Sequence, residues 1–97
     1  MNYRFTPRAE SEAERERDWW RENRLDAPDQ FDEEIAATIE KIRRRPTIGT
    51  VFPVTFPEEV RRVRMRRTNN HVYFAVFNGE IVILSVWGAP RESGPKL

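Results

Sequence analysis

The most constraining feature of the sequence is a pair of turn signals, Asn69-Asn70 and Asn78-Gly79, set between runs of alternating apolar residues. Asn and Gly tolerate the positive φ angles that two-residue β-hairpin turns require. Each flanking run has the length and the β-branched and aromatic content of a strand. The runs are residues 60–68, 71–77 and 81–87. The sequence therefore predicts a three-stranded antiparallel meander in the last third of the chain.

A short strand and a first helix are predicted at the start of the chain. Tyr3 and Phe5 alternate with polar neighbours over residues 2–6, which favours a strand with one buried face. Thr6 followed by Pro7 is a typical helix start, because Thr caps free N–H groups and Pro has none to lose at the first helical position. We expect this helix at roughly residues 7–24.

A second helix is predicted at roughly residues 28–45, after the acid-then-proline start Asp26-Ala27-Pro28. Its apolar residues follow the helical period, and Pro46 ends it. They are Phe31, Ile35, Ile39 and Ile42. Residues 46–59 contain three prolines and a glycine, so we expect a loop there. The predicted class is α+β in one domain, residues 1–97: an N-terminal strand, a helical hairpin and the meander.

The amino-acid composition excludes several classes of function. The 97 residues include no cysteine, which excludes disulfides, a thiol nucleophile and cysteine-ligated metals. No window approaches the roughly 18 consecutive apolar residues of a membrane-spanning helix, and the N-terminus lacks a secretory signal pattern. We therefore expect a cytoplasmic protein that needs no metal or cofactor and has no membrane partner.

The register of the meander separates its residues into two faces if both turns have two residues, because opposed residues share a face. One face is apolar, and the two helices are expected to cover it. It carries Val63, Met65, Val72, Phe74, Val76, Ile81 and Ile83. The other face is half basic and half apolar. It carries Arg62, Arg64, Arg66, His71, Tyr73, Phe77, Val82, Leu84 and Val86.

This second face is the candidate functional surface. If it is open, its apolar area is larger than a monomer usually exposes, which favours a protein partner bound by Arg62, Arg64, Arg66, Tyr73, Phe77, Val82, Leu84 and Val86. The hypothesis requires that the three arginines are not buried against the helices. The alternative is a second core closed by the proline loop or the C-terminal tail. Trp87 shares the core face by register, but it lies at a strand end, where register commonly fails.

The ordered pattern resembles the ParE/RelE superfamily of toxins from bacterial type II toxin–antitoxin systems. The resemblance covers nearly the whole chain and rests on "FTPRA" at the first helix, "IRRRP" ending the second, "VRRVRMRRTNNHVYFAV", and "IVILSVWGAPR". It implies a toxin that is bound by a cognate antitoxin in a hetero-oligomer. In that family the antitoxin docks on the open sheet face and its surroundings.

The superfamily implies two targets, DNA gyrase for ParE-like members and ribosome-bound mRNA for RelE-like members. The long helical hairpin and the "WGAPR" ending are more similar to ParE-like toxins, so the resemblance favours growth arrest by gyrase poisoning. The antitoxin's identity and the stoichiometry of the complex stay open, as does whether toxicity is retained.

The alternative is a RelE-like, ribosome-dependent mRNA endoribonuclease, for which the resemblance implies the catalytic residues Arg62, Arg64, His71 and Arg91. His71 could act as a general base, and the arginines could bind phosphate. Two departures weaken this alternative. Arginine stays protonated, unlike the lysines of such enzymes, and no tyrosine follows Tyr73 to serve as the C-terminal acid.

A third interpretation is a non-toxic RNA-binding or scaffold domain that keeps the fold. Residues 58–97 carry seven of the 17 Lys and Arg residues but four of the 16 acidic ones, so the basic excess is local. Basic strands with interleaved aromatics bind RNA through phosphate contacts and base stacking. Tyr73 and His71 lie beside the arginines in the predicted meander.

Overall fold

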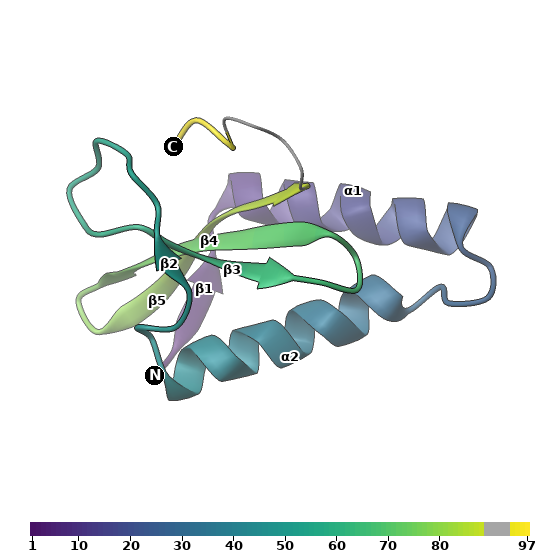
Figure 1. Ribbon diagram of the computed structural model, residues 1–97, viewed down its shortest axis with the longest axis horizontal. Helices are drawn as coiled ribbons and strands as arrows, with labels where there is room; N and C mark the ends of the chain where they lie inside the picture. Colours follow the sequence, from purple (N-terminus) through teal and green to yellow (C-terminus); the bar gives the residue numbers. More distant parts are fainter. Residues whose placement is uncertain (89–93) are drawn as a thin grey trace.

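Two helices and a five-stranded sheet make up the fold in a computed structural model that describes residues 1–88 and 94–97 (Figure 1). The helices are α1 (Pro7–Asn23) and α2 (Gln30–Arg44). The strands are β1 (Tyr3–Phe5), β2 (Thr50–Val51), β3 (Arg61–Met65), β4 (Asn70–Phe77) and β5 (Glu80–Gly88). They lie in the order β1-β5-β4-β3-β2, with β1 parallel to β5 and every other pair antiparallel. The predicted α+β class is confirmed.

Residues at the N-terminus of each helix determine where that helix begins. Thr6 caps α1, its hydroxyl accepting a hydrogen bond from the Ala9 N–H at 3.1 Å, and Pro7 is the first helical residue, as predicted. The second helix begins at Gln30, two residues later than expected. The preceding residues form turns instead, in which Ala27 and Gln30 donate to the carbonyls of Arg24 and Ala27.

The first hydrophobic core lies between the helices and one face of the sheet, as the sequence predicts. The helices contribute small residues and Trp20 from α1 and the periodic apolar residues of α2, packed against the strands. Its buried members are Ala9, Ala13, Trp20, Phe31, Ile35, Ile39, Ile42, Met65, Val72, Phe74, Ile81, Ile83 and Val86. Val63 and Val76 are partly buried against it.

The hairpin between β4 and β5 confirms the predicted Asn78-Gly79 turn. Both residues have positive φ, 48° and 74°, as the type I′ geometry requires. Phe77 lies opposite Glu80, and the pairing Phe74 with Ile83 is also as predicted.

A β-bulge between Tyr73 and Phe74 changes the register further along the hairpin. Tyr73 lies opposite Ser85 rather than Leu84, so β5 has one extra residue at this point. An extra residue reverses the alternation of side chains beyond it. Val86 therefore packs in the first core, and its predicted place on the second face is wrong. Trp87 packs on the second face for the same reason.

The connection between β3 and β4 differs from the prediction. Instead of a two-residue turn at Asn69-Asn70, residues 66–69 form the loop, and Met65 lies opposite Asn70. Arg64 lies opposite His71 rather than Ala75, a shift of four positions. Because this shift is even, every side chain of β3 keeps its predicted face.

Candidate functional site

Two arginines of β3 lie on the second face of the sheet, as predicted. Arg62 lies opposite Tyr73 and Arg64 lies opposite His71. The Arg62 guanidinium lies 5.6 Å from the centre of the Phe52 ring, and Arg64 is exposed and donates to the side-chain oxygen of Asn69 at 3.2 Å. Neither is buried against the helices, so these two of the three arginines meet the requirement stated for this surface.

Arg66 is in the loop after β3, not on the strand where the sequence placed it. The strand ends at Met65 because the loop that follows is held to α2. The carboxylate of Glu34 accepts hydrogen bonds from the N–H groups of Arg67 and Thr68, at 2.8 and 2.9 Å, and from the Thr68 hydroxyl at 2.7 Å. Arg66 is exposed beside this attachment.

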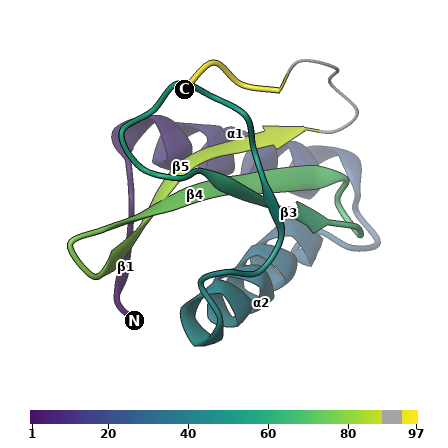
Figure 2. The same cartoon turned by 60° about the vertical axis from the view of Figure 1, so that its left-hand side comes forward.

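The apolar part of the second face is not open, and the prediction of an open sheet face is wrong. Tyr73, Val82 and Leu84 are 1, 2 and 8% exposed, because the proline loop and the C-terminal segment cover them (Figure 2). The alternative of a second core is confirmed. Its buried members are Phe52, Val60, Tyr73, Ala75, Val82 and Leu84. Val54, Phe56, Phe77, Trp87 and Leu97 are partly buried against it.

The C-terminal segment, residues 94–97, packs over this second core. Gly94 has a φ of 64°, and a Cβ there would lie 3.0 Å from both the Phe52 ring and the Tyr73 hydroxyl. Arg8 of α1 donates a hydrogen bond to the carbonyl of Lys96, and Leu97 packs against the second core. Glycine at position 94 therefore lets the chain lie directly on the aromatic pair.

Phe77 is half-buried at the edge of the second core, where its ring meets Phe56 with centroids 5.9 Å apart. Among the apolar residues predicted to contact a partner, Phe77 is the one whose side chain is not fully buried. The accessible part of the predicted surface is thus basic, with one aromatic edge.

His71 lies on β4 directly opposite Arg64, with Arg62 two residues along β3 on the same face, and it is half-buried. Burial lowers the pKa of its imidazole below 6.5, and the positive charges of Arg62 and Arg64 lower this pKa further. Its ring meets Tyr73 edge-on at 6.1 Å. His71 is therefore neutral at pH 7 and can accept or donate a hydrogen bond.

The structure brings together three of the four residues implied for an endoribonuclease: Arg62, Arg64 and His71. Arg91 lies outside the described residues. Such a trio can bind a phosphate and accept a proton. Tyr73, the last tyrosine of the chain, is buried under the loop and the C-terminal segment, so it cannot protonate a ligand on this surface.

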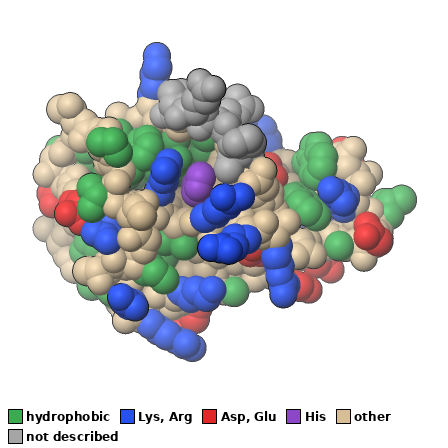
Figure 3. Space-filling view, viewed as in Figure 1, with side chains coloured by type: hydrophobic (Ala, Val, Ile, Leu, Met, Phe, Trp, Pro, Cys, Tyr) green, Lys and Arg blue, Asp and Glu red, His purple; other side chains and the backbone are tan. Residues whose placement is uncertain are grey.

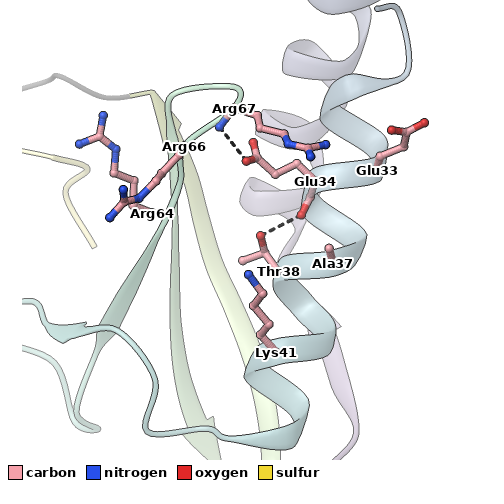
Figure 4. Close-up of a pocket in the computed structure, with 8 residues that line it drawn as sticks. All are labelled: Glu33, Glu34, Ala37, Thr38, Lys41, Arg64, Arg66 and Arg67. Atoms are coloured by element: carbon pink, nitrogen blue, oxygen red, sulfur yellow. Dashed lines mark hydrogen bonds between the residues drawn. The ribbon is translucent and has the colours of Figure 1, made fainter.

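A groove between α2 and the β3–β4 loop adjoins the arginines, and sequence reasoning missed it (Figure 4). Arg64 and Arg66 point away from α2, whereas the Lys41 side chain runs along α2 toward Thr38. The helical residues that line it recur at intervals of three or four, a spacing that could have identified one helix face. The lining consists of Glu33, Glu34, Ala37, Thr38, Lys41, Arg64, Arg66 and Arg67.

The outer edge of β3 is only partly paired. Strand β2 pairs with Arg61 and Arg62, and within residues 1–88 and 94–97 no strand lies beside Val63 to Met65. A free edge presents backbone donors and acceptors to an added strand. The groove, Arg62 and Arg64 lie beside this edge.

Two classes of site find no support in the described part of the chain. Its residues contain no group of three or more His, Asp or Glu side chains placed to hold a metal ion. No helix in residues 1–88 or 94–97 has both the length and the apolar character needed to cross a lipid bilayer.

Comparisons with known proteins give one family match over most of the chain and a structural match that agrees in fold. The model of the family described as "ParE toxin of type II toxin-antitoxin system, parDE" matches residues 3–92. A solved structure described as the chromosomal ParDE TA system from P. aeruginosa has the same fold, with a TM-score of 0.70 and 20% sequence identity. The match covers 91% of this chain and 95% of that one. No curated protein sequence matches the chain.

Proposed function

The chain belongs to the ParE toxin family of type II toxin–antitoxin systems, and on this basis we propose that it arrests growth by poisoning DNA gyrase and is neutralised by a cognate antitoxin. The observation that carries the proposal is the family match over residues 3–92, which includes both helices and every strand. The α1–α2 hairpin, with helices of 17 and 15 residues, accords with a ParE-like rather than a RelE-like toxin.

The antitoxin is proposed to bind the accessible part of the predicted surface. Arg62, Arg64 and Arg66 flank the free edge of β3, and Phe77 offers a partly accessible aromatic edge on the same face, at the far end of β4. An extended acidic segment added beside Val63–Met65 would satisfy free backbone groups and pair its carboxylates with the arginines. The buried residues Tyr73, Val82 and Leu84 join this interface only if the covering loop or tail is displaced.

The gyrase proposal is tested by following labelled thymidine and methionine incorporation in the minutes after the chain is induced in a bacterial host without antitoxin. We expect DNA synthesis to fall first. Purified chain added to gyrase and supercoiled plasmid should then raise the amount of cleaved DNA. Protein synthesis falling first, with no effect on purified gyrase, would contradict the proposal.

A second candidate, mRNA cleavage at the ribosome, is favoured by one observation, the convergence of Arg62, Arg64 and His71. It requires His71→Ala or Arg64→Ala to abolish toxicity while antitoxin binding is largely kept. If both variants stay fully toxic, this candidate is eliminated.

A further inference from the structure

The β3–β4 loop, residues 66–69, is attached to both helices by carboxylates. Glu34 of α2 accepts three hydrogen bonds from backbone and side-chain groups of this loop. Glu16 of α1 accepts a hydrogen bond at 3.0 Å from the side chain of Asn70, the residue that follows the loop. The loop is therefore held by α1 as well as by α2.

Two buried residues join these attachments into one network. The side-chain nitrogen of Asn70 lies 3.1 Å from the Thr68 carbonyl oxygen and 3.3 Å from the Thr68 hydroxyl oxygen. That hydroxyl in turn donates to Glu34 at 2.7 Å. Thr68 and Asn70 are 7 and 2% exposed, and hydrogen bonds shielded from water fix the geometry of the groups they join. We call Glu34, Thr68, Asn70 and Glu16 the loop network.

The position of this loop determines where two arginines lie. Arg66 is part of the loop, and Arg64 donates to the side-chain oxygen of Asn69, another loop residue, at 3.2 Å. Both arginines lie on the side of the loop remote from α2 (Figure 4). Figure 3 shows Lys and Arg side chains gathered on this face of the molecule around its single histidine. A displaced loop would therefore displace Arg66 and release the guanidinium group of Arg64.

Within residues 1–88 and 94–97, no ion pair fixes the side chain of Arg64 or Arg66. A mobile arginine loses conformational freedom when a partner binds it, and this loss weakens the binding. A guanidinium group that is already held in place loses less freedom for each hydrogen bond it forms. The loop network therefore bears on how tightly a partner can bind these two arginines.

We propose that Glu34 and Glu16 are positioning residues for Arg64 and Arg66, which they fix through the loop network in the arrangement that a partner segment meets. This inference rests on the antitoxin interface proposed above and deepens it, because it names two residues that set the affinity of the interface by acting through the loop.

The first test is an NMR titration of the His71 ring protons in the purified chain. Burial, then Arg62 and then Arg64 lower the pKa of this imidazole below 6.5. Glu34→Ala should raise the pKa toward 6.5, because the released Arg64 side chain moves away from the ring. Loss of the negative charge of Glu34 would by itself lower the pKa, so a rise reports movement of neighbouring groups. Glu34→Gln keeps one acceptor oxygen and should raise the pKa less.

The same substitution in an Arg64→Ala background separates positioning from a general loosening around His71. There Glu34→Ala should leave the pKa unchanged, because the charge that it releases is absent. Asn69→Gly should raise the pKa as Glu34→Ala does, since glycine tolerates the φ of 59° at this position but removes the acceptor for Arg64.

The controls match Glu34→Ala in charge and in lost stability. Glu33→Ala removes the same charge from the exposed neighbour, and Ile35→Val weakens the packing of α2 in the first core without touching the loop network. Neither should raise the pKa of His71. The proposal is overturned if Glu34→Ala and Asn69→Gly leave this pKa unchanged, or if Glu34→Ala raises it equally with and without Arg64.

The second test measures binding of a labelled peptide of alternating glutamate and valine by fluorescence anisotropy. Glu34→Ala should weaken binding by about 2- to 13-fold for each arginine that has to be ordered anew. The proposal is overturned if Arg64→Ala weakens binding and Glu34→Ala does not. If neither variant weakens binding, the interface proposal fails, and the titration, which contains no partner, decides the positioning role by itself.

Discussion

The Oε1 atom of Glu12 lies 2.7 Å from the hydroxyl oxygen of Ser85, although the two residues are 73 positions apart in the chain. The same oxygen accepts a hydrogen bond from the Val86 N–H at 3.0 Å. Glu12 is 8% exposed, and its other oxygen lies 3.3 Å from Nε of Arg8. The carboxylate of Glu12 in α1 thus binds the part of β5 that follows the β-bulge.

Replacing Glu12 tests this attachment. Glu12→Ala leaves buried donors without an acceptor, so we expect a loss of about 2–4 kcal/mol in the free energy of unfolding, measured by urea denaturation. Glu12→Gln keeps one acceptor oxygen and should lose less. The control is Glu14→Ala, an exposed residue of the same helix, which should change stability by less than about 0.5 kcal/mol. Equal losses in Glu12→Ala and Glu14→Ala would contradict the assignment.

The loop between β3 and β4 should depend on Glu34 in the same way. Glu34→Ala removes the acceptor for the N–H groups of Arg67 and Thr68, at a cost of about 1.5–3 kcal/mol for hydrogen bonds to a charged group. We expect faster hydrogen exchange at these two amides. Glu33→Ala, the exposed neighbour, is the control and should leave both exchange rates unchanged. Unchanged rates in Glu34→Ala would show that the loop holds its shape without this carboxylate.

Gly49 should not tolerate a side chain. Its φ is 85°, and a Cβ there would lie 2.1 Å from the backbone oxygen of Arg62. Gly49→Ala therefore has to shift β2 away from β3, which we expect to cost at least about 1–3 kcal/mol for the strained backbone alone. Gly79→Ala is an informative comparison, since its φ is also positive but no atom lies within 4 Å of the added Cβ. Thermal unfolding should rank Gly49→Ala as the more damaging change.

The protonation of His71 gives a pH prediction. Its pKa in the folded chain lies below 6.5, through burial first and then through Arg62 and Arg64. Well above pH 6.5 both the folded and the unfolded chain hold His71 neutral, so its contribution to stability is complete. As the pH falls below 6.5, the unfolded chain takes up the proton first, and stability is lost until His71 is protonated in the folded chain too.

An NMR titration of the His71 ring protons checks this prediction. Arg62→Ala and Arg64→Ala should each raise the pKa toward 6.5, because each removes a positive charge, but neither should restore it fully while burial remains. A pKa that stays the same in both variants would show that the arginine charges do not reach the imidazole.

The sequence predicted most of the fold because its signals are local. Asn78-Gly79 fixes its own hairpin, and Thr6-Pro7 fixes its own helix start. The β3–β4 loop was mispredicted because its shape depends on Glu34, a residue 34 positions away from Thr68. The alternation of apolar and polar residues could not reveal that contact. The register of β3 against β4 was nevertheless wrong by an even number of residues, so each side chain of β3 was assigned to its correct face.

The candidate site was predicted less well, for a related reason. Arg62, Arg64 and His71 were placed on the same face correctly, because the face depends only on the parity of the register, although the predicted partners of both arginines were wrong. Val86 was misplaced by the bulge, and Tyr73 was expected to be open although the loop and the C-terminal segment cover it. The alternation of residues along a strand predicts neither the β-bulge nor the segments that cover Tyr73, since both arise from tertiary packing.

The position of β5 in the sheet has a consequence for synthesis on the ribosome. It lies between β1 (Tyr3–Phe5) and β4, and among the strands of residues 1–88 and 94–97 it is the last to be made. Contacts between such distant segments form only when both are available. A nascent chain lacking Ile81 and Ile83 cannot complete the first core, so the native fold becomes accessible only after β5 has emerged. Completion of this interior strand thus sets the earliest point in synthesis at which the native fold can form.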